Sequence, residues 1–352
     1  MRAVLLTGHG GFDKLVLRTD VPRPIAGPGQ VVIRVAAASV NNTDINTRIG
    51  WYSKAVTEAT NVAVASGSAQ EDSTSWTGTQ PHFPRIQGAD ACGIIVEVGT
   101  GVDPNRLGER VLVEPVIRQS DPFDVLYFGS EVDGGFADFT CVPAASAYRI
   151  NSSLSDVELA SLPCAYSAAE NMLTRIGVSA GERLVITGAS GGVGSAAVQL
   201  AKRRGAEVFA IVREEKAEAV RMLGADHIVS GTNSLKALYG NDYFDAAIDV
   251  VGGDGFATLL DVLKRGGRYA TAGAIAGPMV PLDLRTLYLK DLRLIGCTVL
   301  EPDIFPNLVR YIAQNEIQPL IAATYPLSEI VAAQQAFLEK RHVGKIVLTI
   351  AD

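Results

Sequence analysis

The feature that most constrains the fold is a glycine-rich turn between an apolar strand and a helix. Residues 187–194 read TGASGGVG, directly after the apolar run RLVI and before SAAVQLAKRR, whose apolar side chains recur at helical spacing. Glycines in a strand–turn–helix unit let the backbone approach a pyrophosphate, which the helix N-terminus stabilises. A tight turn without a ligand is the alternative, but this context predicts a dinucleotide-binding loop.

Each small residue of this loop has an expected role. Gly191 and Gly192 are predicted to approach the pyrophosphate, and Gly194 to let the helix pack closely on the strand. Ala189 stands where the first glycine of the GxGxxG pattern is usual. The predicted cofactor contacts of the loop are Ala189, Ser190, Gly191, Gly192, Val193 and Gly194.

Strands and helices alternate over residues 151–301. The runs EVFAIV, HIVS, DAAIDVV, GRYATAG and DLRLIGCTVL predict strands, and EKAEAVRMLG and FATLLDVLKRG (256–266) predict helices. Such alternation predicts an α/β Rossmann domain, a doubly wound parallel sheet with helices on both faces.

The first 150 residues have a different pattern of apolar and polar residues. Short apolar or alternating runs such as VVIRVAAASV and FADFTCVP are separated by Gly, Pro and Asp, which predicts a small, mostly antiparallel barrel. Two stretches, 53–85 and 114–135, read as irregular, and the first is long enough to be either functional or disordered. The residues after Pro302 continue neither pattern cleanly.

Composition narrows the class of protein. A length of 352 residues suits two domains, and a net charge of −7 argues against nucleic acid or an anionic membrane surface as partner. No apolar run is long enough to span a bilayer. The four cysteines show no disulfide or zinc-finger spacing, so we expect a reducing, cytoplasmic setting.

Several motifs in a characteristic order carry a family resemblance. They are PGQVVIRVAAASVNNTDINTRIGWY, QGADACGIIVEVGTGV, GGFADF, GERLVITGASGGVG and LGADHIV. With them the chain resembles the medium-chain dehydrogenase/reductase superfamily, in its zinc-independent, zeta-crystallin-like quinone oxidoreductase branch. The resemblance implies a discontinuous GroES-like catalytic domain (1–150 and 302–352), an NADP-binding Rossmann domain (151–301), and a homodimer joined through the edge strand at 291–300.

The resemblance also bears on zinc. Asn41 stands where zinc-dependent relatives carry a thiolate, and Ala89 stands where they carry an imidazole. Cys164 is the remaining ligand position, and one thiolate is too few for a tetrahedral zinc. Residues 114–135, the place of a structural zinc lobe in relatives, contain no cysteine. We therefore expect no metal.

The cofactor is expected to be NADPH. Dinucleotide sites that prefer NAD place an acidic residue at the end of the second strand, where this chain has Arg213, with Lys216 three residues on. An arginine there favours a 2′-phosphate, although the segment also reads as a solvated helix start. Relatives often carry a tyrosine near the position of Gly231. By resemblance, further cofactor contacts are Ser167, Val250, Val251, Gly273, Ala274 and Lys345.

Without zinc, hydride transfer is easiest to an acceptor that already delocalises charge, such as an enone, an enal or a quinone. Asn41, Thr43 and Tyr52 are the candidate donors to the enolate. Asn41 and Asp44 are equally residues that cap or brace the loop, Tyr52 is equally a packing residue beside Trp51, and solvent is an alternative proton source.

Three functions therefore stay open. The first is NADPH-dependent reduction of an activated C=C bond or a quinone. The second is metal-free reduction of a ketone or aldehyde, and the third is a low-turnover NADPH-binding sensor or structural protein. The segment 53–85 is expected to be either a lid over the substrate or a surface loop.

Overall fold

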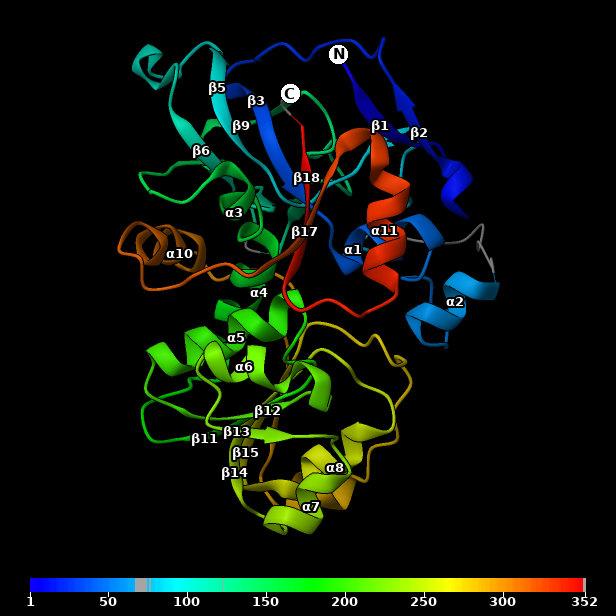
Figure 1. The fold of residues 1–352 in the computed structure, drawn as a ribbon, viewed down its shortest axis with the longest axis vertical. Coiled ribbons are helices and arrows are strands. Elements are labelled where there is room, and N and C mark those ends of the chain that lie inside the picture. The colour runs from blue at the N-terminus through cyan, green and yellow to red at the C-terminus, as the bar shows by residue number, and fades with distance from the viewer. Residues whose placement is uncertain (67–74, 76, 122, 351–352) are drawn as a thin grey trace. The chain divides into compact units, whose positions relative to one another are not determined.

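The computed structural model describes residues 1–66, 75, 77–121 and 123–350, and the chain divides into two compact units (Figure 1). The first unit comprises Met1–Val56, Ala63–Cys164 and Phe305–Asp352, and the second comprises Thr57–Val62 and Ala165–Ile304. The first unit extends beyond residue 150 because α3 (Asp156–Ala160) contacts its strands β3 and β5.

The largest sheet of the first unit is mostly antiparallel, with the order β10–β6–β5–β3–β18–β17, and β9 also pairs with β3. Its strands are β3 (Gln30–Ser39), β5 (Cys92–Val98), β6 (Arg110–Val113), β9 (Phe139–Pro143), β10 (Ala147–Arg149), β17 (Ile321–Pro326) and β18 (Lys345–Thr349). Strand β18 pairs antiparallel with β3, with Leu348 opposite Ala38. The C-terminal segment thus completes the sheet begun by the N-terminal residues.

Smaller elements surround this sheet. Strand β1 (Ala3–Leu6) pairs with β2 (Leu15–Arg18) and β4 (Arg85–Ile86), and the helices are α1 (Asn42–Ile49), α3, α10 (Ile304–Ala313) and α11 (Ile330–Leu338). Helix α2 (Thr60–Ser66) is divided between the units, because its residues up to Val62 belong to the second unit. Residues 114–135, predicted to be irregular, contain a two-stranded hairpin of β7 (Val116–Arg118) and β8 (Val125–Tyr127). Buried aliphatic side chains of β1, β3, β5, β18 and α11 form one core.

The segment 53–85 is only partly described. Helix α2 lies within it, and β4 begins at its last residue. Residues 67–74 and 76 lie outside the described part, so the expectation of a lid stays a prediction.

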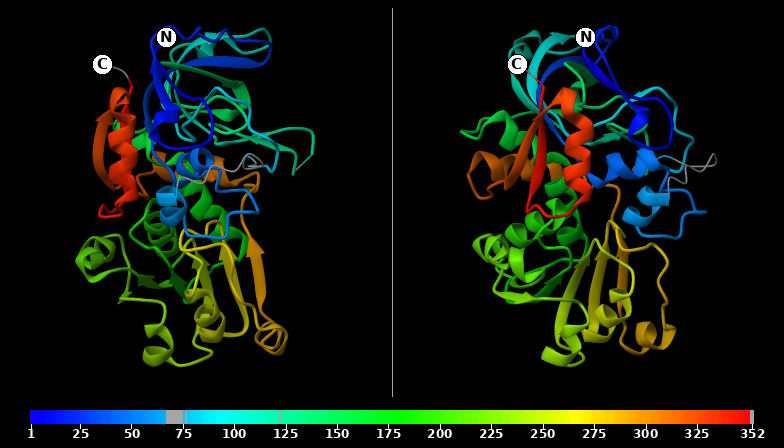
Figure 2. Two further views of the ribbon diagram at one scale, coloured as in Figure 1. Left: turned by 90° about the vertical axis from the view of Figure 1, so that its right-hand side faces the viewer. Right: turned by 45° about the vertical axis from the view of Figure 1, so that its right-hand side comes forward.

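The second unit contains the predicted Rossmann sheet. Six strands pair in parallel in the order β13–β12–β11–β14–β15–β16. The strands are β11 (Arg183–Ile186), β12 (Glu207–Ile211), β13 (His227–Val229), β14 (Phe244–Asp249), β15 (Leu263–Thr271) and β16 (Arg293–Gly296). The helices are α4 (Pro163–Arg175), α5 (Gly192–Arg203), α6 (Ala217–Met222), α7 (Ser234–Tyr239), α8 (Gly255–Val262) and α9 (Leu284–Leu289). They cover both faces of the sheet (Figure 2), which confirms the predicted fold class.

Two predicted boundaries in this unit were wrong. The helix expected over 256–266 ends at Val262, because Leu263 already pairs with Phe244 across β14 and β15. Gly266, with φ of +73°, would also break a helix at that point. The edge strand expected over 291–300 is shorter and spans Arg293–Gly296.

Candidate functional site

The glycine loop of the second unit is shaped by the chain's own packing at one position. A Cβ added to Gly194 would lie 2.1 Å from the carbonyl oxygen of Gly188 and 2.7 Å from the Cα of Ala189. Both neighbours are backbone atoms that no side-chain movement can displace. The predicted close packing at Gly194 is therefore confirmed, and it lets α5 begin directly after the turn.

Gly191 differs from Gly194 because the protein itself does not require a glycine there. Its φ is −80°, and the nearest atom to an added Cβ is the Gly188 carbonyl oxygen at 3.5 Å, an ordinary contact. The missing side chain leaves room in front of the first turn of α5. The space fits the approach of a pyrophosphate to the helix N-terminus.

The structure brings three predicted cofactor segments together at the carboxyl ends of the parallel strands. A Cβ on Gly188 would lie 3.2–3.3 Å from the side chains of Val251 and Val250. One on Gly273 would lie 3.3 Å from the Val250 carbonyl oxygen. The ends of β11, β14 and β15 therefore meet, as expected for the ligand-binding edge of a doubly wound sheet.

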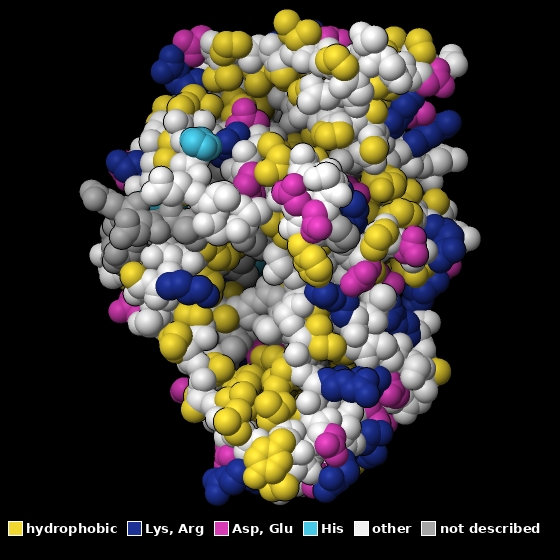
Figure 3. Space-filling view, turned by 180° about the vertical axis from the view of Figure 1, so that it is seen from behind, with side chains coloured by type: hydrophobic (Ala, Val, Ile, Leu, Met, Phe, Trp, Pro, Cys, Tyr) yellow, Lys and Arg dark blue, Asp and Glu magenta, His cyan; other side chains and the backbone are white. Residues whose placement is uncertain are grey.

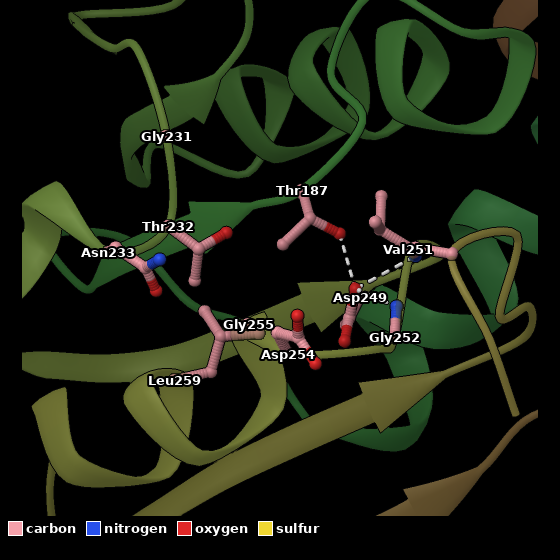
Figure 4. Close-up of a pocket in the computed structure, with 11 residues that line it drawn as sticks. Thr187, Gly231, Thr232, Asn233, Asp249, Val251, Gly252, Asp254, Gly255 and Leu259 are labelled. Atoms are coloured by element: carbon pink, nitrogen blue, oxygen red, sulfur yellow. Dashed lines mark hydrogen bonds between the residues drawn. The ribbon is translucent and has the colours of Figure 1, made fainter. Parts of the chain in front are cut away.

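Asp249 joins these strand ends and was not among the predicted site residues. Its Oδ1 accepts hydrogen bonds from the Thr187 hydroxyl and from the backbone N–H groups of Val251 (2.9 Å) and Gly252 (3.1 Å), as Figure 4 shows in part. Its Oδ2 accepts from the Tyr269 hydroxyl at 2.7 Å. Burial and the negative charge of Asp249 raise the pKa of Tyr269, so this phenol stays protonated and donates.

A pocket of about 300 Å³ opens beside this carboxylate (Figure 4). It is lined by Thr187, Gly231, Thr232, Asn233, Asp249, Val251, Gly252, Asp254, Gly255, Leu259 and Ala276. Sequence reasoning missed Thr232, Asn233 and Asp254. The rule that ligands bind beyond the carboxyl ends of parallel strands, applied to β13 and β14, could have found them. Gly231, where relatives often carry a tyrosine, adds no side chain to this wall.

Arg213 lies directly after β12, at the same edge of the sheet. Its side chain is 70% exposed, and its nearest acidic partner is Glu215 at 3.8 Å. Lys216 is buried, and burial followed by the charge of Arg213 lowers its pKa. Ser167 is buried within α4. The guanidinium of Arg213 is thus the more accessible of the two cations for an anionic group.

Asn41 of the first unit uses both amide hydrogens inside the protein. Its Nδ2 donates to Asp90 Oδ2 at 2.7 Å and to the carbonyl oxygen of Ser39 at 3.2 Å, while its Oδ1 accepts from Lys345 Nζ. The sequence left two roles open for this amide, a donor to the substrate and a brace of the loop. In the structure it connects α1 to the loop that carries Asp90.

Lys345 belongs to the same buried group. The sequence prediction was that it contacts the cofactor, whereas in the structure its ammonium contacts groups of the protein. Its ammonium donates to Asn41 Oδ1 and lies 3.4 Å from both the Val40 carbonyl oxygen and Asp90 Oδ2. The carboxylate of Asp90 accepts further hydrogen bonds from the Ser39 hydroxyl and from the backbone N–H of Cys164. Asp90 was missed as a site residue, although an aspartate inside the apolar run GADACGII is unusual enough to suggest a buried role.

Asp44 adds a second buried carboxyl group nearby. It accepts hydrogen bonds from the backbone N–H groups of Asn41 (2.7 Å) and Gly88 (3.2 Å). Burial, and to a smaller extent the charge of Asp90, raises the pKa of Asp44 to about 7. Asp44 therefore ties the start of α1 to the 86–91 loop.

Thr43 and Tyr52 form a hydroxyl pair beside this group. The Tyr52 hydroxyl donates to Thr43 Oγ1 at 3.3 Å, and Tyr52 packs edge-on against Trp51. Burial raises the pKa of Tyr52 to about 12. The phenol therefore stays protonated at neutral pH.

The positions expected to bind zinc in relatives do not suit a metal ion in this chain. The amide oxygen of Asn41 already accepts from an ammonium, Ala89 has no side-chain donor atom, and Cys164 supplies a single thiol. Across the described ranges, no three His, Cys, Asp or Glu side chains converge in a way that could hold a metal ion. A dication at this place would also be repelled by Lys345.

Comparisons with known proteins agree with this architecture. The family described as alcohol dehydrogenase GroES-like domain matches residues 27–152, and that described as zinc-binding dehydrogenase matches residues 192–314. A solved structure assigned to the alcohol dehydrogenases, from Sinorhizobium meliloti 1021, is 44% identical over 99% of this chain and 96% of its own, with a TM-score of 0.88. These matches define a two-domain oxidoreductase fold of the alcohol dehydrogenase type.

Two curated relatives locate the chain within that class. Acryloyl-coenzyme A reductase of Metallosphaera sedula is 28% identical and is matched over 99% of this chain and 100% of its own length. Human quinone oxidoreductase is 24% identical over 99% of this chain and 98% of its own. The chain belongs to the medium-chain dehydrogenase/reductase superfamily, among its quinone oxidoreductase-like members.

Proposed function

We propose that the protein is an NADPH-dependent, zinc-independent reductase of activated C=C bonds, in enones or enals, or of quinones. The observation that carries the proposal is the Tyr52–Thr43 hydroxyl pair beside a buried group whose cation is the ammonium of Lys345. An acceptor that delocalises its own charge needs only a hydride and a proton. The similarity to acryloyl-coenzyme A reductase, which reduces a C=C bond conjugated to a carbonyl, supports this acceptor class.

Residues of the second unit fit a dinucleotide. The space in front of Gly191 would admit the pyrophosphate, and the N-terminus of α5 would stabilise its charge. The exposed guanidinium of Arg213 would pair with a 2′-phosphate, the group that distinguishes NADPH from NADH. Bound NADPH would supply a hydride to the β-carbon of the acceptor.

Residues of the first unit would then handle the proton. As the C=C π electrons move towards the carbonyl oxygen, the Tyr52 hydroxyl donates a hydrogen bond to the developing enolate and delivers its proton. Before the reaction the single O–H of Tyr52 donates to Thr43 Oγ1 at 3.3 Å. It turns from Thr43 to the substrate for this step, and the Thr43 hydroxyl then donates to the phenolic oxygen and holds it in place. Solvent reprotonates Tyr52, and the products are the saturated carbonyl compound and NADP⁺.

A substrate panel tests the reaction class. NADPH oxidation, followed by its absorbance, is measured with an enal, an enone, a quinone and a simple ketone. Turnover of the conjugated acceptors alone supports the proposal, turnover of the simple ketone supports a carbonyl reductase, and NADPH binding without oxidation supports a sensor. Replacing Arg213 by Ala tests the cofactor: an unchanged preference for NADPH over NADH would refute the role of Arg213.

We also propose a homodimer formed through β16, the last strand in the order of the parallel sheet. The preceding segment, residues 279–289, exposes large apolar side chains, and apolar side chains gather on the lower part of the face in Figure 3. The exposed residues are Met279, Leu282, Leu284, Tyr288 and Leu289. Sedimentation analysis of wild type and Leu289→Glu tests the proposal, which a monomeric wild type would refute.

The structure adds one finding on membranes. Among the described residues, no helix has the length and apolar character that crossing a membrane requires.

A further inference from the structure

Lys345 is unusual because its charge is buried and all its donors are used inside one unit. The side chain of Lys345 is 4% exposed and that of Asp90 is fully buried. An ammonium has three N–H donors, and the oxygen atoms around this one belong to Asn41, Val40 and Asp90. In this arrangement no donor of Lys345 is left over for a cofactor.

Asp90 is the point where four chain segments meet. It accepts hydrogen bonds from Ser39 at the end of β3, from Asn41 before α1, and from the backbone of Cys164 at the start of α4. Lys345, at the start of β18, supplies the compensating charge. We call this group of Ser39, Asn41, Asp90, Cys164 and Lys345 the junction. Removing one partner of a buried ion pair leaves an uncompensated charge, so the stability of the junction depends on the ammonium.

The junction is connected to the hydroxyl pair through a short piece of chain. Asn41 precedes the first residue of α1, and Thr43 is the second residue of that helix. The amide of Asn41 is fixed at both ends, by Lys345 on its oxygen and by Asp90 on its nitrogen. The orientation of Thr43, and of the Tyr52 hydroxyl that donates to it, follows from how this turn is held.

We propose that Lys345 is a positioning residue, which acts through Asn41 and Asp90 to hold the Thr43–Tyr52 hydroxyl pair in place for protonation. The inference rests on the proposed reductase function and reassigns a residue expected to bind the cofactor. A displacement of roughly 1 Å of a catalytic group costs up to about 100-fold in rate. Loss of the ammonium should therefore lower kcat and leave cofactor affinity unchanged.

The test compares Lys345→Ala with Lys340→Ala. Lys340 donates to Asn42 Oδ1 at 3.0 Å, so the control removes a lysine that contacts the neighbouring residue from outside the junction. Lys345→Ala is expected to reduce kcat for an enone by roughly 10–100-fold, with the Kd for NADPH within twofold of wild type. Propylammonium chloride should restore part of the lost kcat in a saturable way, and should not affect Lys340→Ala.

Two outcomes would overturn the proposal. One is a Kd for NADPH raised at least tenfold with kcat unchanged, the result expected of a direct cofactor contact. The other is failure of propylammonium to change either kcat or the thermal unfolding midpoint of Lys345→Ala. The unfolding measurement needs no substrate. It therefore tests the junction separately from the reductase function, which a wild type inactive on every acceptor would refute.

Discussion

Alanine substitutions at two glycines of the loop, Gly194 and Gly191, should have different effects. The first should lower the stability of the fold, and the second should lower the affinity for NADPH. Replacing Gly194 by Ala forces a Cβ to 2.1 Å from the Gly188 carbonyl oxygen, where the obstructing atoms are backbone. The turn or the start of α5 must then move. Overpacking of a well-packed site costs about 1–3 kcal/mol, and we expect the upper end because no side chain can yield.

Replacing Gly191 by Ala should give the opposite result. The new methyl group would meet its nearest neighbour at 3.5 Å, and φ of −80° suits alanine. The free energy of unfolding should stay within about 1 kcal/mol of wild type, since Gly-to-Ala changes at compatible positions have small effects. The methyl group would occupy the space assigned to the pyrophosphate, so the Kd for NADPH should rise at least about tenfold, or 1.4 kcal/mol.

Urea unfolding gives the stabilities, and titration of NADPH fluorescence gives the affinities. A Gly194→Ala variant as stable as wild type would show that the packing argument is incorrect. A stable Gly191→Ala variant with wild-type affinity for NADPH would show that the pyrophosphate lies elsewhere.

Three further predictions concern single side chains. The pKa of Asp44 is raised to about 7 in the folded state, so the folded protein binds this proton more tightly than the unfolded chain does. The free energy of unfolding of the wild type should therefore fall as the pH rises from about 4 to 7. Urea unfolding of Asp44→Asn should show little of this pH dependence. Asp249→Ala leaves the Tyr269 hydroxyl and two backbone N–H groups without their acceptor, which should destabilise the fold by about 3 kcal/mol. Asp249→Asn keeps one oxygen atom and should destabilise it less. Equal losses of stability in thermal unfolding would contradict this reasoning. Tyr52→Phe keeps the aromatic ring beside Trp51 but removes the hydroxyl proton. The kcat for an enone should therefore fall by roughly 10²-fold or more, while the midpoint of thermal unfolding changes little. An unchanged kcat would show that solvent supplies the proton.

The sequence predicted what depends on neighbours along the chain. The strand, glycine turn and helix around residue 190 are contiguous, so their pattern alone indicated the parallel sheet and the close packing at Gly194. The end of α8 was mispredicted because LKRG is compatible with a helix, while pairing of Leu263 with Phe244 decides the outcome. Propensity is a weak guide where tertiary contacts compete with it.

The buried group of the first unit lay beyond such reasoning. Asn41 and Asp90 are 49 residues apart, and Asp90 and Lys345 are 255 residues apart. Taken one at a time, Asn41 resembles a donor to the substrate and Lys345 a residue that contacts the cofactor. Only the fold shows that each satisfies the other.

The pairing of β18 with β3 has a consequence for the order in which the protein is made. During synthesis, β3 and the carboxylate of Asp90 emerge long before residue 345, the source of the cation that compensates that carboxylate. The intervening residues from Ala165 to Ile304 make up the second unit together with Thr57–Val62, and this unit can fold while the first is still open along β3. A ribosome-bound chain that stops short of β18 should thus carry a finished parallel-sheet unit and an incomplete, aggregation-prone antiparallel sheet.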